Sequence, residues 1–173
     1  MDVDFSSAQS PLGVTLRGQV RVAWERPERL DVVSVDPVAI EGRALAKADR
    51  MTVEATLATS VVYRCVRCLA SFREALEARL QESFSRVPVD QEDEDNDVVF
   101  VDGTTVCLDP YIEQSLLLAL RQHPVCRADC KGLCAICGAD LNAGECGCDR
   151  RVIDPRLEVL AQFLDETDED KNS

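Results

Sequence analysis

Hydrophobic and polar residues alternate along much of the first hundred residues. The alternation is clearest over 14–24 and 51–63, where the apolar side chains fall on every second position. A period of two is typical of a strand with one buried face. Shorter apolar stretches over 38–44, which begins just after a proline, and over 98–101 predict two further strands.

The segment that follows Cys68 is ambiguous. Its apolar residues repeat every four positions, a spacing that suits either a helix or a strand: Phe72, Leu76, Leu80 and Phe84. We favour a strand, because a strand ending at Cys65 and another leaving Cys68 would form a hairpin. The sequence therefore predicts a mostly antiparallel sheet that is curved or partly closed.

Two helices are expected in the second half of the chain. Asp109 followed by Pro110 is typical of an N-cap with proline at the first helical position. An apolar face then runs from Ile112 to Leu120, and Pro124 should end the helix. A second Asp-Pro pair predicts a short helix over 155–164. The fold class is α+β: a curved, mostly antiparallel sheet with two short helices and a C-terminal cysteine-rich zinc module.

The charge is strongly acidic and unevenly placed. The 173 residues include 32 Asp or Glu and 19 Lys or Arg, for a net charge of −13. The runs 90–97 and 165–173 hold much of the excess, either as solvated, disordered segments or as binding sites for a basic partner. We expect a sheet region over 1–106 with an acidic loop at 86–97. A helix and cysteine module over 107–164 should pack on the sheet, before a disordered acidic tail at 165–173.

No export or membrane signal is evident in the sequence. The first residues lack a basic start followed by an apolar run, and no stretch approaches the length of a membrane span. We therefore expect a cytoplasmic protein with no membrane partner, whose thiols face a reducing environment.

Cysteine spacing carries the strongest chemical signal. Eight of the nine cysteines divide into two sets of four, and four sulfurs are the donor set of a structural zinc ion. The preferred division gives one ion to Cys65, Cys68, Cys126 and Cys130, and a second to Cys134, Cys137, Cys146 and Cys148. Cys130 and Cys134 could exchange sites, so one or two zinc ions are expected. Gly138 should give the second set a turn with positive φ.

Other chemistries for these cysteines stay open. Disulfides would require export, and an iron–sulfur cluster would use four cysteines without either ferredoxin-type spacing. Cys65 and Cys68 could form a redox pair, because neighbouring arginines would lower a thiol pKa. Catalytic zinc would need an open coordination position, and His123, the single histidine, is more typical of a surface group.

Three arginines lie close to the first cysteine pair along the chain: Arg64, Arg67 and Arg73. They are candidate RNA phosphate contacts, although they could equally be solvated or screen thiolates. An acidic protein gains nothing from long-range attraction to RNA, so any such contact should be local.

Motifs over Tyr63 to Leu164 resemble one family. They are CVRCL from Cys65, the stretch LDPYIEQSLLLALRQHPVCRADCKGLCAICGADLN from Leu108, then CGCD and IDPRLEVL. In this order they resemble the YceD family, the large ribosomal RNA subunit accumulation proteins. Ala135 stands where that family often has proline, a mild departure that leaves every candidate ligand in place.

The resemblance implies a part in accumulation of large-subunit (23S) rRNA and in ribosome assembly. It implies no catalytic residues and no enzymatic activity. The expected partner is a ribosomal protein, a large-subunit rRNA intermediate or both, with no small-molecule substrate. A zinc-stabilised transcription or regulatory adaptor and a thiol oxidoreductase using Cys65 and Cys68 are the alternatives.

Overall fold

The computed structural model describes residues 1–22, 31–88 and 98–149. Its contacts divide the chain into two compact units, Met1–Asp129 and Cys130–Ser173. The predicted boundary after residue 106, and the packing of the cysteine module on the sheet, stay predictions. The acidic run 90–97, the predicted helix over 155–164 and the acidic tail lie outside the described residues.

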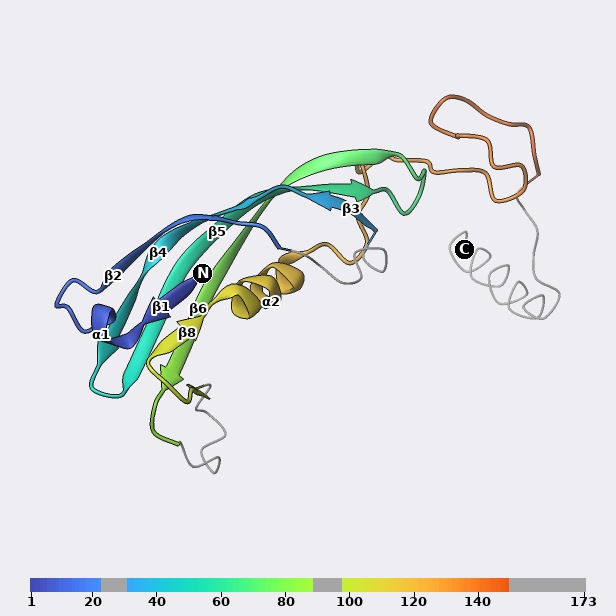
Figure 1. Ribbon diagram of the computed structural model, residues 1–173. Helices are drawn as coiled ribbons and strands as arrows, with labels where there is room; N and C mark the ends of the chain where they lie inside the picture. The colour runs from blue at the N-terminus through green and yellow to red at the C-terminus, as the bar shows by residue number, and fades with distance from the viewer. Residues whose placement is uncertain (23–30, 89–97, 150–173) are drawn as a thin grey trace, which may run out of the picture. The chain divides into compact units, whose positions relative to one another are not determined.

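A curved six-stranded sheet dominates the first unit (Figure 1). Its main path follows the order β2 (Val14–Val20), β4 (Val38–Lys47), β5 (Arg50–Arg64), β6 (Ser71–Ser85) and β7 (Val98–Phe100), and β3 (Val32–Val35) pairs with β5. All pairs are antiparallel except β6 with β7. The mostly antiparallel sheet and the α+β class are therefore confirmed.

The segment after Cys68 is a strand, as predicted. β5 and β6 pair over their full lengths, from Arg50 opposite Ser85 to Arg64 opposite Ser71. Because facing residues of an antiparallel pair share a face, the apolar positions of β6 join those of β5 on the inner face of the sheet. Leu57, Leu80 and Phe84 are among the buried side chains there. Burial of this shared apolar face is what selects a strand over a helix.

Short elements near the N-terminus cover part of the inner face. β1 (Asp2–Asp4) pairs with β8 (Thr105–Cys107), and α1 (Phe5–Ala8) follows β1 directly. The Asp4 side chain caps α1 by accepting hydrogen bonds from the backbone of Ser6 and Ser7. The sequence predicted none of these three elements, because each is too short to show a period.

Helix α2 (Asp109–Ala119) packs its predicted apolar face into the same core, where Ile112 and Leu116 are fully buried. Two details of the prediction were wrong. The N-cap is Leu108, which makes no side-chain capping bond, and the Asp109 carboxylate forms an ion pair with the Met1 amine. The helix ends at Ala119, with extended backbone at Leu120, so the chain leaves the helix before Pro124.

The outer face of the sheet is exposed and basic. The outward positions of β2, β4, β5 and β6 carry three acids, Glu41, Glu54 and Glu77, against seven bases. The bases, all exposed, are Arg17, Arg43, Lys47, Arg50, Arg64, Arg73 and Arg79. A protein with a net charge of −13 thus presents a face with four more positive than negative charges.

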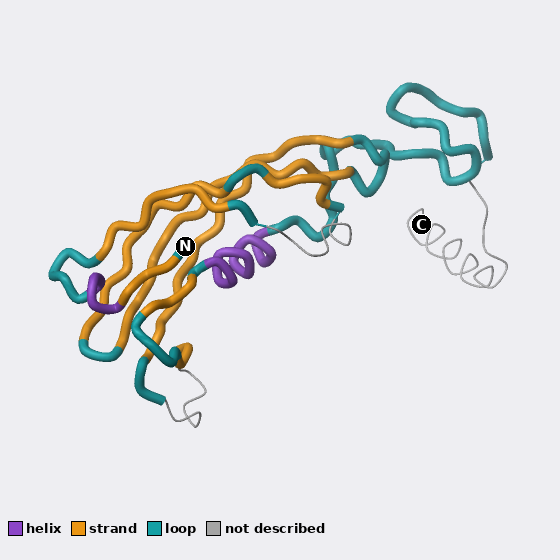
Figure 2. Tube along the Cα trace, in the orientation of Figure 1, coloured by secondary structure: helices purple, strands orange, loops and turns teal. Residues whose placement is uncertain are grey.

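The second unit holds neither helix nor strand within residues 130–149, which Figure 2 draws as loop throughout. An isolated bridge joins Leu133 to Asp140, and Leu141 donates its backbone N–H to the Gly132 carbonyl at 3.0 Å. Besides cysteines and Gly132, Leu141 is the one buried residue among 130–149. So small an apolar core cannot by itself hold such a chain in one shape.

Candidate metal centres

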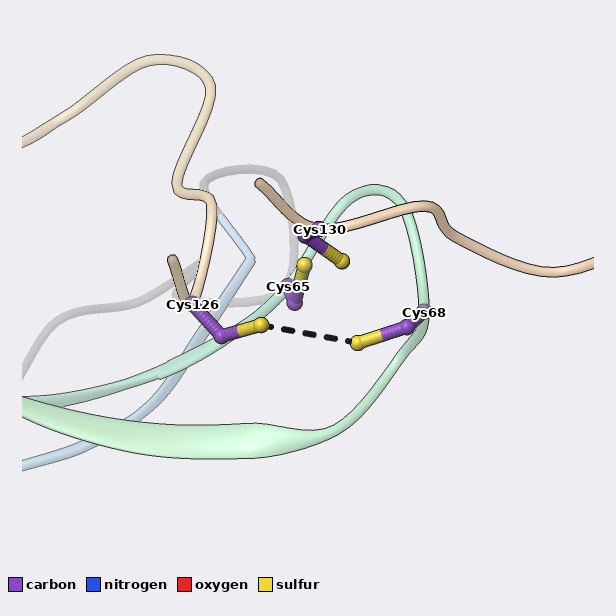
Figure 3. Close-up of side chains that lie close together, drawn as sticks. All are labelled: Cys65, Cys68, Cys126 and Cys130. Carbon is purple, nitrogen blue, oxygen red and sulfur yellow. Dashed lines mark hydrogen bonds between the residues drawn. The ribbon is translucent and has the colours of Figure 1, made fainter. Parts of the chain in front are cut away.

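The first cysteine group consists of Cys65, Cys68, Cys126 and Cys130, and Figure 3 shows the four sulfurs turned toward one another. All four Sγ atoms lie within 4.8 Å of each other, and those of Cys68 and Cys126 are 3.7 Å apart. A tetrahedral ion with metal–sulfur distances of about 2.3 Å would hold its ligands roughly 3.8 Å apart. The spacing of this group therefore suits one metal ion.

A tight turn between β5 and β6 positions Cys65 and Cys68. Leu69 donates its N–H to the Cys65 carbonyl, Cys65 donates to Ala70, and both bonds are 2.9 Å long. The turn closes with Leu69 at φ +62. It also aims the Arg67 backbone N–H at the Cys65 sulfur, 3.4 Å away.

A backbone hydrogen bond connects the chain beyond α2 to this hairpin. Val66 donates its backbone N–H to the Pro124 carbonyl at 2.9 Å. Pro124 precedes Cys126 by two residues, so this bond brings Cys126 beside the hairpin sulfurs. Cys130 follows four residues later along the chain.

The surroundings of Cys65 favour a thiolate. Burial by itself would raise the pKa of this thiol, but backbone N–H groups of Cys126, Cys68 and Arg67 stabilise the charged sulfur and bring the pKa to about 6. A thiolate is the form that binds metal. Because Cys65 is fully buried, it is poorly placed to attack an external disulfide, which disfavours the redox interpretation.

The second group consists of Cys134, Cys137, Cys146 and Cys148, whose Sγ atoms also lie within 4.8 Å of one another. Gly138 has φ +74, as the sequence predicted, and donates its N–H to the Cys134 carbonyl at 2.8 Å. Cys134 in turn donates to the Ala139 carbonyl at 2.8 Å. The preferred division of the eight cysteines is thus the one that the fold brings together.

The pKa values of the second group suit a site that can hold a cation. Backbone N–H groups of Cys137 and Ile136 lower the pKa of Cys134 to about 6. Hydrogen bonding to the Cys137 and Cys146 side chains raises the pKa of Cys148 to about 12, since a further negative charge beside those sulfurs is unfavourable. Four adjacent sulfurs ionise together only when a cation offsets their repulsion, so the donor set fits a dication.

Asn142 also contacts the first group, although the sequence did not single it out. Its side-chain amide donates to the Cys130 sulfur at 3.7 Å and to the Asp140 carboxylate at 2.7 Å. Its side-chain oxygen accepts the Lys131 N–H at 2.9 Å. Asn142 therefore orients the Cys130 sulfur and the backbone beside it. The Asp-x-Asn spacing, which is typical of a turn, was the available signal.

The remaining candidates lie outside these groups. Cys107 is exposed on β8, and His123 is exposed beyond α2. Arg73 pairs with Asp36, while Arg64 and Arg67 are exposed at the hairpin. A role of Arg64, Arg67 and Arg73 in RNA contact stays a prediction. All nine cysteines are thiols in the structure.

None of the helices in the described ranges has both the length and the apolar character needed to cross a membrane. No solved structure gives a significant match to the chain.

Several curated proteins are similar to the chain. An uncharacterized protein of Mycobacterium tuberculosis H37Rv, Rv2926c, is 33% identical over 140 residues, which cover 78% of this chain and 67% of that protein. The uncharacterized protein YlbN of Bacillus subtilis is 26% identical over 140 residues, which cover 80% of this chain and 81% of that protein. The uncharacterized protein ML1660 of Mycobacterium leprae is 33% identical over 132 residues, which cover 74% of this chain and 59% of that protein.

A family model matches residues 53–164, a range that includes most of β5, all of β6 and α2, and every cysteine of the two groups. Its description reads large ribosomal RNA subunit accumulation protein YceD. The chain belongs to the YceD family.

Proposed function

We propose that this protein is a non-enzymatic factor in ribosome biogenesis that supports accumulation of the large-subunit (23S) rRNA by binding a ribosomal protein or a pre-rRNA intermediate. The family match over residues 53–164 carries the proposal. The matched range contains the sheet hairpin, the helix and both cysteine groups, so the parts that define the family are also those with distinctive chemistry.

The proposal includes two structural zinc ions, one in each cysteine group. Zinc prefers four tetrahedral ligands and binds thiolates well, which fits four cysteine sulfurs in each group. Four protein sulfurs complete the coordination of zinc and leave no position for water or substrate. A site of this kind supplies folding free energy rather than catalysis, which supports a binding role.

The charge distribution supports a role among ribosomal components. The acidic runs 90–97 and 165–173 suit a basic ribosomal protein, while the arginines near the hairpin suit local contact with rRNA phosphates. Localisation in the cytoplasm, where ribosomes assemble, belongs to the same proposal.

The test is a complementation experiment in a bacterium whose own family member has been deleted. The deletion should lower the ratio of 23S to 16S rRNA, and expression of this chain should restore it. An affinity-tagged copy should recover large-subunit rRNA or ribosomal proteins from growing cells. An unchanged rRNA ratio, together with recovery of RNA polymerase instead of ribosomal components, would favour the transcription adaptor.

A further inference from the structure

We infer that the outer face of the sheet is an RNA-binding surface, centred on a groove beside the turn between β4 and β5. This inference deepens the proposed function, on which it rests for the choice of RNA as the anionic partner. The sequence pointed to arginines at the cysteine hairpin; the register of the sheet points to a different set of cations.

The groove has a volume of about 430 Å³ and is lined by Arg43, Leu45, Lys47, Arg50, Thr52 and Glu54. Three of these side chains are basic and one is acidic. Arg43 lies 3.6 Å from Glu54, but both side chains are more than half exposed, so this ion pair holds Arg43 only weakly. The groove therefore keeps an excess of positive charge.

Lys47 and Arg50 face each other directly in the register of β4 and β5. Like charges at facing positions repel and destabilise a sheet. Neither side chain has an acidic partner within the parts of the chain that the structure describes, and the nearby Asp49 is engaged by Arg86 at 2.7 Å. An anion between Lys47 and Arg50 would convert this repulsion into two attractive contacts.

A second groove continues along the sheet. It has a volume of about 600 Å³, shares Arg43 and Glu54 with the first, and adds one base and one acid, Arg79 and Glu41. The two grooves together hold four bases and two acids, so the excess of positive charge comes from the first groove. The two grooves together extend from Arg50 to the level of Thr56 on β5, about 20 Å at the rise of an antiparallel strand. A surface of this length suits several phosphates of one strand rather than a single small anion.

RNA fits this surface better than an acidic protein does. Phosphates repeat regularly along a strand and are bound by Arg and Lys, while Thr52 and Thr56 offer hydroxyl groups to the same backbone. Leu45, half-buried opposite Thr52, offers an apolar contact for a ribose or a base. No binding of particular base sequences is implied, because such contacts are to the backbone.

The test compares two matched double variants in RNA binding. Lys47→Gln with Arg50→Gln removes two charges from the groove, and Arg64→Gln with Arg67→Gln removes two exposed charges at the cysteine hairpin. Fluorescence anisotropy would follow a labelled single-stranded RNA of about 20 nucleotides, as salt is varied, with polyglutamate of similar length as the acidic-protein probe.

We expect the groove variant to bind RNA about 25-fold more weakly at 0.1 M salt, with the slope of log K against log salt smaller in magnitude by about 1.4. The hairpin variant should lose less affinity than the groove variant, because Arg64 and Arg67 do not line the groove. Any of four results would overturn the inference. The groove variant could bind RNA as tightly as the unmodified protein, or only the hairpin variant could lose affinity. The unmodified protein could fail to bind RNA, or it could bind polyglutamate as tightly as RNA.

Folding and function can be separated in this experiment. Removing facing like charges should leave the melting temperature unchanged or higher, so weaker binding would not reflect unfolding. If the groove variant recovers ribosomal components as well as the unmodified chain, the groove is wrong and the proposed function stands. If neither the groove variant nor the unmodified chain recovers ribosomal components, while the unmodified groove still binds RNA in vitro, the proposed function fails instead.

Discussion

Leu69 and Gly138 occupy the same position in two turns with one hydrogen-bond pattern. Each is the fourth residue after a cysteine, donates its N–H to that cysteine's carbonyl, and has positive φ, +62 for Leu69 and +74 for Gly138. The fifth residue, Ala70 or Ala139, accepts a hydrogen bond from the same cysteine N–H. The two turns thus present their first cysteine alike, although only one uses the residue best suited to this backbone.

Replacing Leu69 by glycine should raise the free energy of unfolding by about 1 kcal/mol. Left-handed backbone is costly for a residue with a Cβ, and Leu69 is 58% exposed, so little packing is lost. Guanidinium unfolding would measure the change. The reciprocal control is Gly138→Ala, which should lose a similar amount because the added Cβ meets no atom within 4 Å and costs only backbone strain. A destabilised Leu69→Gly variant would show that this side chain makes important contacts.

Protein purified without oxygen should contain two zinc ions per chain. Cys68→Ser and Cys137→Ser each remove one sulfur from a different group, so each variant should retain one ion and the double variant none. Elemental analysis by mass spectrometry gives the ratio. Cys107→Ser is the matched control, because Cys107 belongs to neither group, and it should retain both ions. Loss of both ions from either single variant would contradict two separate sites.

Chelation should unfold the segment 130–149 before the sheet. Besides its cysteines, that segment buries one apolar side chain, Leu141, whereas the sheet has a continuous apolar core that does not depend on metal. Limited proteolysis with and without a strong chelator, followed by mass spectrometry, would locate the new cleavage sites. Cleavage that starts within β4, β5 or β6 would be inconsistent with this order, as would a chelated protein that resists protease throughout.

Asn142→Ala should weaken metal binding at the first group by about 10- to 100-fold, the usual effect of removing a residue that orients a ligand. Competition with a coloured chelator would measure the affinity of each ion. Asn142→Asp keeps the size of the side chain, but it replaces the donor to Cys130 with a negative oxygen, so its affinity should be at least as low. The ion of the second group serves as the internal control; equal retention of both ions would rule out this role.

Gly42→Ala should destabilise the protein by about 3 kcal/mol, the upper end of the usual range for overpacking. A Cβ at Gly42 would lie 2.3 Å from the Glu54 carbonyl oxygen and 2.5 Å from the Ala55 Cα, both parts of the facing strand that cannot move aside easily. Gly18→Ala in β2 is the matched control, since its Cβ would meet nothing within 4 Å. Thermal unfolding of both variants would test this prediction. Similar melting temperatures would mean that β4 and β5 can move apart with little loss of stability.

The sequence by itself determined β2, β4, β5 and the apolar face of α2, because a half-buried strand or helix repeats its apolar residues at a fixed period. It also determined the eight candidate ligands, because donor number and spacing are local properties of the chain.

Only the tertiary structure decided what depends on distant partners. Pairing with β5 made 72–84 a strand, and the fold pairs the Asp109 carboxylate with the Met1 amine. The fold settled which cysteines meet, brought Asn142 to Cys130, and placed Lys47 opposite Arg50. Each of these depends on register or on contacts between separate segments, and local periodicity carries no information about either.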